Sequence, residues 1–573
     1  MKEVLSFIKK YKKEAVLAPA FKMTEALLEL FVPLVVSSVI DVGIEGKNTS
    51  YIISHSLLLL LLAAVGFLFS STAQYMSAKA AVGTSCDLKS ELFKHIQGFS
   101  YSGLDSVGTS TLITRMTSDV NQVQSGINLT LRLFLRSPFI VFGAMIMAFT
   151  LDFKSALIFV VTIAVLSLIV FTIIGVTIPK HKNVQKKLDG VLLSVRENLS
   201  GVRVLRAFRK EPSELEAFEN KNAALYKAQC SVGKITALMN PLTLLAINAA
   251  VIVLLYTGAV KVNKGELSAG TVVALYNYMT QILVELIKLA NLIVNITKSI
   301  ASANRLSYIL EMPESEIESN TQGSEFKNGD IEFSCVSFGY DGAGAESLSS
   351  ISFKAKKGST VGIIGGTGSG KSTLINLIPR FYDVKSGAVT VNGTNVKDIN
   401  TASLRKNIGV VPQKAVLFKG SVRENLLMGN ENATEQDMEE ALKLSESYEF
   451  VSQKKGYLDF ELEPGGKNLS GGQKQRLTIA RALVKKPSIL ILDDSASALD
   501  LATDARLRAN IASLKDKPTT FIVSQRAAAV MNSDTILVLD DGAAVAMGKH
   551  EELLKNCAIY REIYNSQFKK EAE

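Results

Sequence analysis

The most informative stretch of the sequence is Gly365-Gly366-Thr367-Gly368-Ser369-Gly370-Lys371-Ser372. It fits the phosphate-binding loop pattern G-x-x-x-x-G-K-[ST] at every fixed position. The apolar run 360–364 before it predicts a buried strand, and the segment 373–378 after it predicts a helix. Glycines let backbone N–H groups close around phosphate oxygens, and the start of a helix adds its positive dipole end. Because strand, loop and helix agree, a glycine-rich turn without a ligand is disfavoured.

The loop supplies most of the residues that we expect to bind a nucleotide. Lys371 is placed to reach the β- and γ-phosphates, and the hydroxyl group of Ser372 is placed to ligate Mg²⁺. The complete set expected from this region is Gly365, Gly368, Ser369, Gly370, Lys371, Ser372 and Thr373.

A second motif is more specific than the loop. The residues 469–473 read LSGGQ, and further along the chain the apolar run 488–492 ends in Asp493. A serine and glycine N–H groups at the start of a helix form a site for an anion. An ordinary helix cap would explain LSGG alone, but not its spacing to Lys371 and Asp493. Together these motifs resemble the ATP-binding cassette (ABC) family, in which LSGGQ is the signature and Asp493 matches the Walker B aspartate, a ligand of Mg²⁺.

The resemblance implies how two cassettes share ATP. In this family two cassettes dimerise head to tail, so Ser470, Gly472 and Gln473 of one subunit would cap the ATP held by the loop of the other. Tyr340 matches the aromatic residue that stacks on adenine, a contact with known energetic value; an ordinary edge-strand tyrosine is the alternative. Gln413, which follows Val410-Val411-Pro412, matches the glutamine that senses Mg²⁺ and links the cassette to the membrane helices.

Composition narrows the class of protein. The chain has 573 residues, a formal charge of +9 and a mean hydropathy of +0.22. The 4 cysteines and 4 histidines are scattered, so they indicate neither a disulfide framework nor a metal cluster. A basic chain can bind nucleic acid, but basic residues also flank membrane helices on the cytoplasmic side. The apolar runs favour the second interpretation, so we expect a lipid bilayer and no nucleic acid as partner. No cleavable signal peptide is predicted.

The first part of the chain contains six apolar runs of a length that spans a bilayer. They are Val16–Val42, Ile52–Tyr75, Leu133–Leu151, Ala156–Ile178, Pro241–Val260 and Val272–Ile293. The links after the second and fourth runs are long and basic, which marks them as cytoplasmic. Both termini and the cassette then lie in the cytoplasm. We therefore expect a transmembrane domain at 1–310, a linker at 311–330 and the cassette at 331–573.

The two long links keep a helical pattern, so they are interpreted as spanning helices prolonged into the cytoplasm. Breakers at Phe99–Gly103 and at Glu211–Glu214 predict the turns at their tips. Six spans with two long excursions, followed by a cassette, resemble the ABC exporters, in which the tips are coupling helices that press on the cassettes. The expected fold is thus an all-α six-helix transmembrane domain followed by an α/β P-loop NTPase domain, in a bacterial plasma (inner) membrane.

Some spans carry charged residues, which are costly at membrane depth. On the last span, Glu285 and Lys288 are spaced to form an ion pair, or they line a cavity. Glu25 and Glu29 on the first span leave the same two alternatives open.

Two positions depart from the family pattern. Asp494 stands where the family has the glutamate that positions or deprotonates the attacking water, and Gln525 stands where it has the switch histidine. The Asp494 carboxylate is one methylene shorter, and a neutral amide brings no charge to the γ-phosphate. The sequence therefore indicates a cassette that binds ATP and hydrolyses it poorly. It resembles the degenerate-site subunit of heterodimeric multidrug ABC exporters, whose partner half-transporter has the glutamate and the histidine.

The substrate class is expected to be broad: an amphipathic drug, lipid or peptide. Three rivals remain. A regulatory or channel-like ABC protein would be gated by ATP without pumping, and a slow homodimeric exporter would need no partner. A soluble ABC ATPase of the DNA-repair kind is disfavoured by the six apolar runs.

Overall fold

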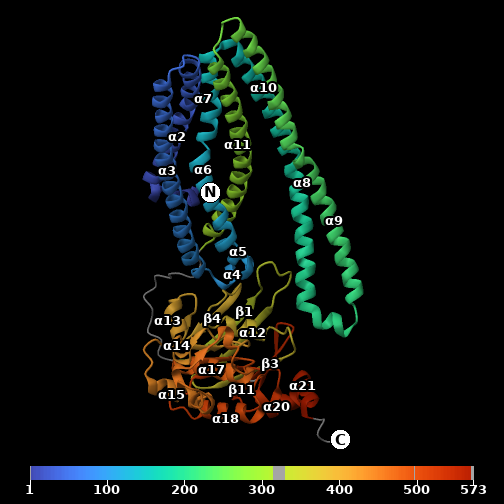
Figure 1. Ribbon diagram of the computed structural model, residues 1–573. Coiled ribbons are helices and arrows are strands. Elements are labelled where there is room, and N and C mark those ends of the chain that lie inside the picture. The colour runs from blue at the N-terminus through green and yellow to red at the C-terminus, as the bar shows by residue number, and fades with distance from the viewer. Residues whose placement is uncertain (1, 314–328, 496, 569–573) are drawn as a thin grey trace. The chain divides into compact units, whose positions relative to one another are not determined.

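The computed structural model describes residues 2–313, 329–495 and 497–568, and it divides into two compact units (Figure 1). The first unit contains Met1–Lys94 and Ser110–Met312, and the second contains His95–Thr109 and Pro313–Glu573. Most of the linker expected at 311–330 lies outside the described residues.

The first unit is entirely helical among its described residues. Its α-helices are α1 (Lys2–Ile8), α2 (Lys12–Ser38), α3 (Thr49–Gln97), α5 (Thr109–Thr114), α6 (Val120–Leu133), α7 (Arg136–Leu151), α8 (Phe153–Ala207), α9 (Glu211–Ala237), α10 (Met239–Asn263) and α11 (Ala269–Leu310), with short irregular helical turns at Lys9–Tyr11, Val39–Ile44 and Arg115–Asp119. Joined through these turns and across the short breaks at Phe134–Leu135 and Leu238, they give 6 helical stretches long and apolar enough to cross a membrane, which confirms the expected number of spans.

The spanning helices continue well beyond a bilayer. Helix α8 has 55 residues, and at 1.5 Å per residue it is about 80 Å long, against a hydrocarbon core of about 30 Å. The expected prolongation into long helices is confirmed. The second tip differs from the expectation in detail, because the turn lies at residues 208–210. Glu211 already begins α9, and Pro212 occupies its first turn, where proline is tolerated because no N–H partner is lost.

Small side chains let the helices of the first unit approach closely. Ala26 on α2, Ala144 and Ala148 on α7, and Ala274 on α11 are fully buried in one cluster. The hydroxyl group of Tyr278 donates a 2.5 Å hydrogen bond to the Leu30 carbonyl oxygen, which ties α11 to α2. These contacts fix the relative positions of α2, α7 and α11.

The second unit contains a six-stranded sheet in the order β12-β11-β3-β10-β9-β6. Its strands are β3 (Thr360–Gly365), β6 (Ile408–Val411), β9 (Ile489–Asp493), β10 (Thr519–Val523), β11 (Thr535–Asp540) and β12 (Ala543–Gly548). All neighbours are parallel except β11 and β12. The central strands are continuous apolar runs because both faces of the sheet are covered.

An antiparallel sheet of order β2-β1-β4-β5 and a two-stranded pair β7-β8 complete the strands that the described residues form. Their bounds are β1 (Ile331–Phe338), β2 (Leu348–Ala355), β4 (Ser386–Val391), β5 (Thr394–Asn395), β7 (Gly420–Ser421) and β8 (Glu461–Leu462). The α-helices are α4 (Tyr101–Val107), α12 (Lys371–Asn376), α13 (Thr401–Lys406), α14 (Val422–Leu427), α15 (Glu435–Leu444), α16 (Tyr448–Ser452), α17 (Gly471–Leu483), α18 (Leu501–Ala512), α19 (Ala527–Val530), α20 (His550–Asn556) and α21 (Ala558–Phe568). The expected α/β cassette is present.

Candidate functional site

The strand order brings four loops to one edge of the six-stranded sheet. Strands β3, β10, β9 and β6 are consecutive and parallel, so the segments that follow them leave from the same edge. Open parallel sheets bind their ligands at this carboxyl edge. The phosphate-binding loop follows β3, Gln525 follows β10, Asp494 follows β9 and Gln413 follows β6.

The glycines of the loop are required by their surroundings. A Cβ atom on Gly365 would lie 2.1 Å from the Leu539 carbonyl oxygen on the neighbouring strand. Gly370 has a φ of +89° and caps α12, and a Cβ atom there would lie 2.8 Å from the Ser347 carbonyl oxygen. Residues with side chains would therefore move the loop out of its path.

Lys371 holds the loop closed from inside. Its ammonium group is buried and donates hydrogen bonds to the carbonyl oxygens of Gly365, at 3.0 Å, and Gly366, and to the Ser369 hydroxyl oxygen at 3.2 Å. Burial lowers the pKa of Lys371, although the carboxylates of Asp494 and Asp493 oppose this effect. A phosphate group in the loop would meet a cation that is already positioned.

Ser372 and Asp493 form the part of the site that suits a magnesium ion. The Ser372 hydroxyl group donates a 3.0 Å hydrogen bond to Oδ1 of Asp493, so a hydroxyl and a carboxylate oxygen lie side by side. Burial raises the pKa of Asp493, as does the nearby charge of Asp494, while Ser372 and Lys371 lower it. Oxygen ligands of this kind are those that Mg²⁺ prefers, so the donor set fits the ion. Ser372 and Asp493 would hold the ion, which would supply positive charge to offset that of the phosphate groups.

The two positions that depart from the family pattern also lie here. Oδ2 of Asp494 accepts a long, 3.5 Å hydrogen bond from the side-chain amide of Gln413. Burial raises the pKa of Asp494, against the opposing effects of Gln413, Arg526 and Lys371. The main-chain oxygen of Gln525 accepts from Gln567 at 2.8 Å.

These groups share one pocket of about 670 Å³. Among the residues expected from the sequence, those that line it are Tyr340, Gly368, Gly370, Lys371, Ser372, Thr373, Gln413, Asp493, Asp494 and Gln525. Gly365 and Ser369 lie within the loop and are not part of the lining. Lining residues that were not predicted from the sequence include Glu346, Ser347 and the Asp541-Gly542 pair in the β11–β12 turn. An Asp-Gly pair signals a hairpin, but nothing in it points to a ligand.

Tyr340 lies at the edge of this pocket with its ring supported by other aromatic residues. Its hydroxyl group is 3.1 Å from Oγ1 of Thr373, next to the phosphate-binding loop. The Tyr340 ring meets Phe338 at 5.0 Å and Tyr382 at 5.3 Å, both nearly perpendicular. The neighbours that brace the ring thus contact it edge-to-face and not as parallel stacks.

The signature residues do not line this pocket. Ser470 is exposed and caps α17, where its hydroxyl group accepts from the Gln473 N–H at 3.3 Å and its own N–H donates to Oε1 of Gln473 at 3.0 Å. Space around Gly471 is open within 4 Å, whereas Gly472 lies against the Ala498 carbonyl oxygen. The motif therefore presents an exposed helix start, the kind of surface that binds an anion.

The first helix tip belongs to the same unit as the cassette. The Tyr101 ring of α4 stacks on Phe381 at 4.3 Å, and the Ser102 hydroxyl group donates a 2.7 Å hydrogen bond to Asp341. A third contact joins Tyr382 to Asp105 at 2.7 Å. The sequence located this tip, but its partners on the cassette carried no recognisable pattern.

Comparisons with known proteins agree with this geometry. The family model for the ABC transporter transmembrane region matches residues 16–286, and the model for the ABC transporter cassette matches residues 348–497. The chain is 36% identical over 571 residues to the uncharacterized ABC transporter ATP-binding protein YfiB of Bacillus subtilis, covering 100% of this chain and 99% of that relative. It is 32% identical over 594 residues to the putative multidrug export ATP-binding/permease protein YgaD of the same species, covering 99% of each.

One solved structure, of a bacterial Atm1-family ABC exporter with ATP bound, superimposes with a TM-score of 0.81. The match covers 99% of each chain at 23% sequence identity, and at that identity it speaks for the fold alone.

Proposed function

The chain belongs to the ABC transporter family, and we propose that it is one half of a heterodimeric exporter that binds ATP in its own cassette and completes the hydrolytic site of its partner. Its six membrane-spanning helices and its fused ATPase domain make it a multi-pass protein of ATP-driven export. The membrane would be the bacterial plasma membrane, with the cassette and both termini in the cytoplasm. The transmembrane domain would end near residue 310 and the cassette would begin near residue 331.

The proposal rests on one pocket that contains both the expected phosphate-binding residues and the two positions that depart from the family pattern. Lys371, Ser372 and Asp493 would hold ATP and Mg²⁺ there. Asp494 and Gln525 line the same pocket in place of a glutamate and a histidine. A correctly placed general base contributes roughly 10²–10⁴ in rate, and a shorter side chain forfeits much of that. The site would thus retain ATP for long periods.

The exposed signature motif supports the proposal that this chain completes the hydrolytic site of its partner. Ser470 and Gly471 are exposed at the start of α17 and do not line the chain's own nucleotide pocket. The family arrangement would use them to cap ATP on another subunit, and an intact cap is useful only if that subunit hydrolyses. The partner would be an ABC half-transporter with the glutamate and the histidine. Transport would follow alternating access, with the cassettes closing around ATP and α4 passing the motion to the membrane helices.

The test begins with an affinity tag on this chain in its native host. The complex is extracted in mild detergent, and the subunits that copurify are identified by mass spectrometry. We expect a second half-transporter in equal amount, and an ATPase rate far above that of this chain purified alone. If the chain purified alone has the same ATPase rate as the complex extracted from the host, it is a slow homodimer and the heterodimer is wrong.

Reconstituted vesicles separate a pump from a channel. The complex is incorporated into sealed liposomes and supplied with ATP and a fluorescent amphiphile on the cassette side. An exporter accumulates the amphiphile in the lumen against its gradient, whereas a channel only equalises the two sides. Equalisation without accumulation would contradict export.

A further inference from the structure

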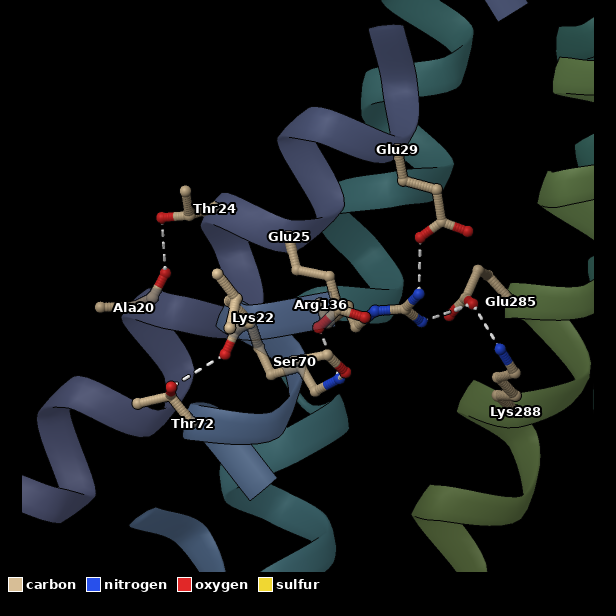
Figure 2. A network of polar contacts seen from close by, with 11 residues as sticks. Ala20, Lys22, Thr24, Glu25, Glu29, Ser70, Thr72, Arg136, Glu285 and Lys288 are labelled. Atoms are coloured by element: carbon tan, nitrogen blue, oxygen red, sulfur yellow. Dashed lines mark hydrogen bonds and ion pairs between the residues drawn. The ribbon is translucent and has the colours of Figure 1, made fainter. Parts of the chain in front are cut away.

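Charged side chains from α2, α7 and α11 form a connected network in the first unit (Figure 2). Arg136 donates to Oε2 of Glu29 and to Oε1 of Glu285, both at 2.7 Å, and Lys288 donates to the same Glu285 oxygen at 2.8 Å. Beside them, Lys22 pairs with Glu25 at 2.5 Å. Three cations face three carboxylates, so the formal charges cancel. The Glu285–Lys288 ion pair, one of the two alternatives from the sequence, is present.

The network lies at membrane depth. Glu285 is 16 residues from the start of α11 at Ala269, which corresponds to about 24 Å at 1.5 Å per residue. Arg136 is 15 residues from the end of α7 at Leu151, or about 22 Å. The start of α11 and the end of α7 both lie next to short links between spans, so the network lies inside a hydrocarbon core of about 30 Å. Charges at this depth face protein or a water-filled cavity, because lipid cannot solvate them.

Exposure divides the network into a buried centre and two open ends. The side chains of Arg136 and Glu285 are 9% and 3% exposed, while those of Glu29 and Lys288 are 42% and 43% exposed. Since lipid is excluded as a neighbour of half-exposed charges, these two ends face water or another protein surface. The network therefore leaves one carboxylate and one ammonium group accessible in this chain.

The buried centre fixes these two ends at a short separation. The Glu29 carboxylate and the Lys288 ammonium group are joined through Arg136 and Glu285 by three contacts of 2.7 to 2.8 Å, so they lie within about 10 Å of each other. Glu285 is held further by the Ser137 hydroxyl group at 2.7 Å. The open ends are thus positioned by a rigid base.

Two buried polar atoms in or next to the charged network lack a hydrogen-bond partner among the described residues. They are Nε of Arg136 and Oε1 of Gln281. Gln281 lies one helical turn before Glu285 on α11. Buried polar atoms are satisfied in nearly all native structures, so an additional polar group or water is expected here.

We propose that Glu29 and Lys288 bind the head group of a zwitterionic amphiphile, one that carries a cationic group a few bonds from a phosphate. The inference rests on the proposed exporter function and names the substrate class for it. Glu29 pairs with the cationic group and Lys288 with the phosphate. A head group of net zero charge leaves the balanced network neutral, whereas a purely anionic or cationic amphiphile satisfies one end and adds an uncompensated charge at low dielectric.

The test measures binding to the complex purified through a tag on this chain. A short-chain phosphatidylethanolamine labelled on its acyl chain is the fluorescent probe. It is displaced by three unlabelled competitors with equal acyl chains: phosphatidylethanolamine, phosphatidylglycerol and a diacyl trimethylammonium lipid. We expect the zwitterionic competitor to bind about tenfold more tightly than the other two, as for one additional charge-assisted contact.

Two variants should separate the two ends. Glu29→Gln should remove the advantage over the anionic lipid, and Lys288→Gln should remove the advantage over the cationic lipid. Neither leaves Arg136 or Glu285 without an ionic partner, so folding should be retained. Lys264→Gln and Glu266→Gln, in the exposed link between α10 and α11, are matched controls and should change nothing.

Equal affinities of the wild-type complex for all three lipids would overturn the inference. So would an unchanged preference in both variants, which would mean that the partner subunit covers Glu29 and Lys288. ATPase activity is measured on the same samples. Activity without a zwitterion preference rejects the site and leaves the exporter standing, whereas a preference without ATPase activity supports the site and rejects the exporter.

Discussion

The hydroxyl group of Tyr382 donates a 2.7 Å hydrogen bond to the carboxylate of Asp105 on α4, and the Tyr382 ring also meets Tyr340 edge-on at 5.3 Å. One side chain therefore contacts both the helix tip and the tyrosine at the nucleotide pocket. Burial raises the pKa of Tyr382, and the Asp105 carboxylate adds to this, so the hydroxyl group remains a donor at physiological pH. The Tyr382 side chain therefore links α4 to the aromatic residues at the nucleotide pocket.

Tyr382→Phe keeps the ring and removes the hydrogen bond to Asp105. ATP affinity at this chain's loop should stay within about twofold of wild type, because Tyr340 keeps its aromatic neighbour. Stimulation of ATPase activity by an amphiphile should fall severalfold, since a hydrogen bond to a charged group is worth about 1.5–3 kcal/mol at most. Tyr448→Phe, in the same cassette and with no hydrogen bond to its hydroxyl among the described residues, is the control. Equal losses of affinity and stimulation would argue against a coupling role.

Gly365→Ala tests whether the loop depends on backbone proximity to β11. The new Cβ atom would overlap the Leu539 carbonyl oxygen at 2.1 Å, so the loop or the strand must shift. Overpacking of this kind costs about 1–3 kcal/mol, and we expect a lower melting temperature and at least tenfold weaker ATP binding. Gly366→Ala is the matched control, because nothing lies within 4 Å of its Cβ position. Similar losses in both variants would show that the loop tolerates no side chain for another reason.

Much of the nucleotide site could be predicted because its residues follow buried apolar strands. The runs that end at Gly365 and Asp493 are nearly fully buried, and parallel strands bring their ends together. Contacts between distant segments could not be predicted in this way. Asp541 lines the pocket from a hairpin turn and Tyr382 contacts α4, and no local sequence pattern predicts either contact.

The charged network of α2, α7 and α11 could also be predicted only in part from the sequence. Glu285 and Lys288 were visible as an i,i+3 pair, whereas Arg136 stands at the start of an apolar run and resembles an ordinary flanking charge. Only the packing of α7 between α2 and α11 shows that it bridges Glu29 and Glu285. The turn at residues 208–210 was misplaced by a few positions, because Pro212 is as compatible with a first helical turn as with a break.

Asp494→Glu combined with Gln525→His should restore hydrolysis at this chain's own site. The longer carboxylate would reach the attacking water, and the imidazole would contact the γ-phosphate. The measurement is single-turnover hydrolysis of labelled ATP in a complex whose partner has lost its catalytic glutamate. Asp494→Asn with Gln525→His, which lacks the base, is the control and should stay inactive. If the repaired site remains silent when the partner's signature is also intact, these two residues are not the reason that the site is slow.

In the proposed heterodimer one polypeptide serves two different ATP molecules, and two substitutions separate these two roles. Ser470→Arg should block closure over the partner's ATP, abolishing most ATPase activity while leaving nucleotide binding to this chain's loop nearly unchanged. Lys371→Ala should do the opposite, because it removes a charge-assisted contact to phosphate in the slow site. The decisive measurement is ATPase rate together with photolabelling of this chain by an ATP analogue, on each purified complex. We expect opposite patterns for the two variants, whereas equal losses of both readouts in both variants would mean two equivalent sites and would rule out the asymmetric heterodimer.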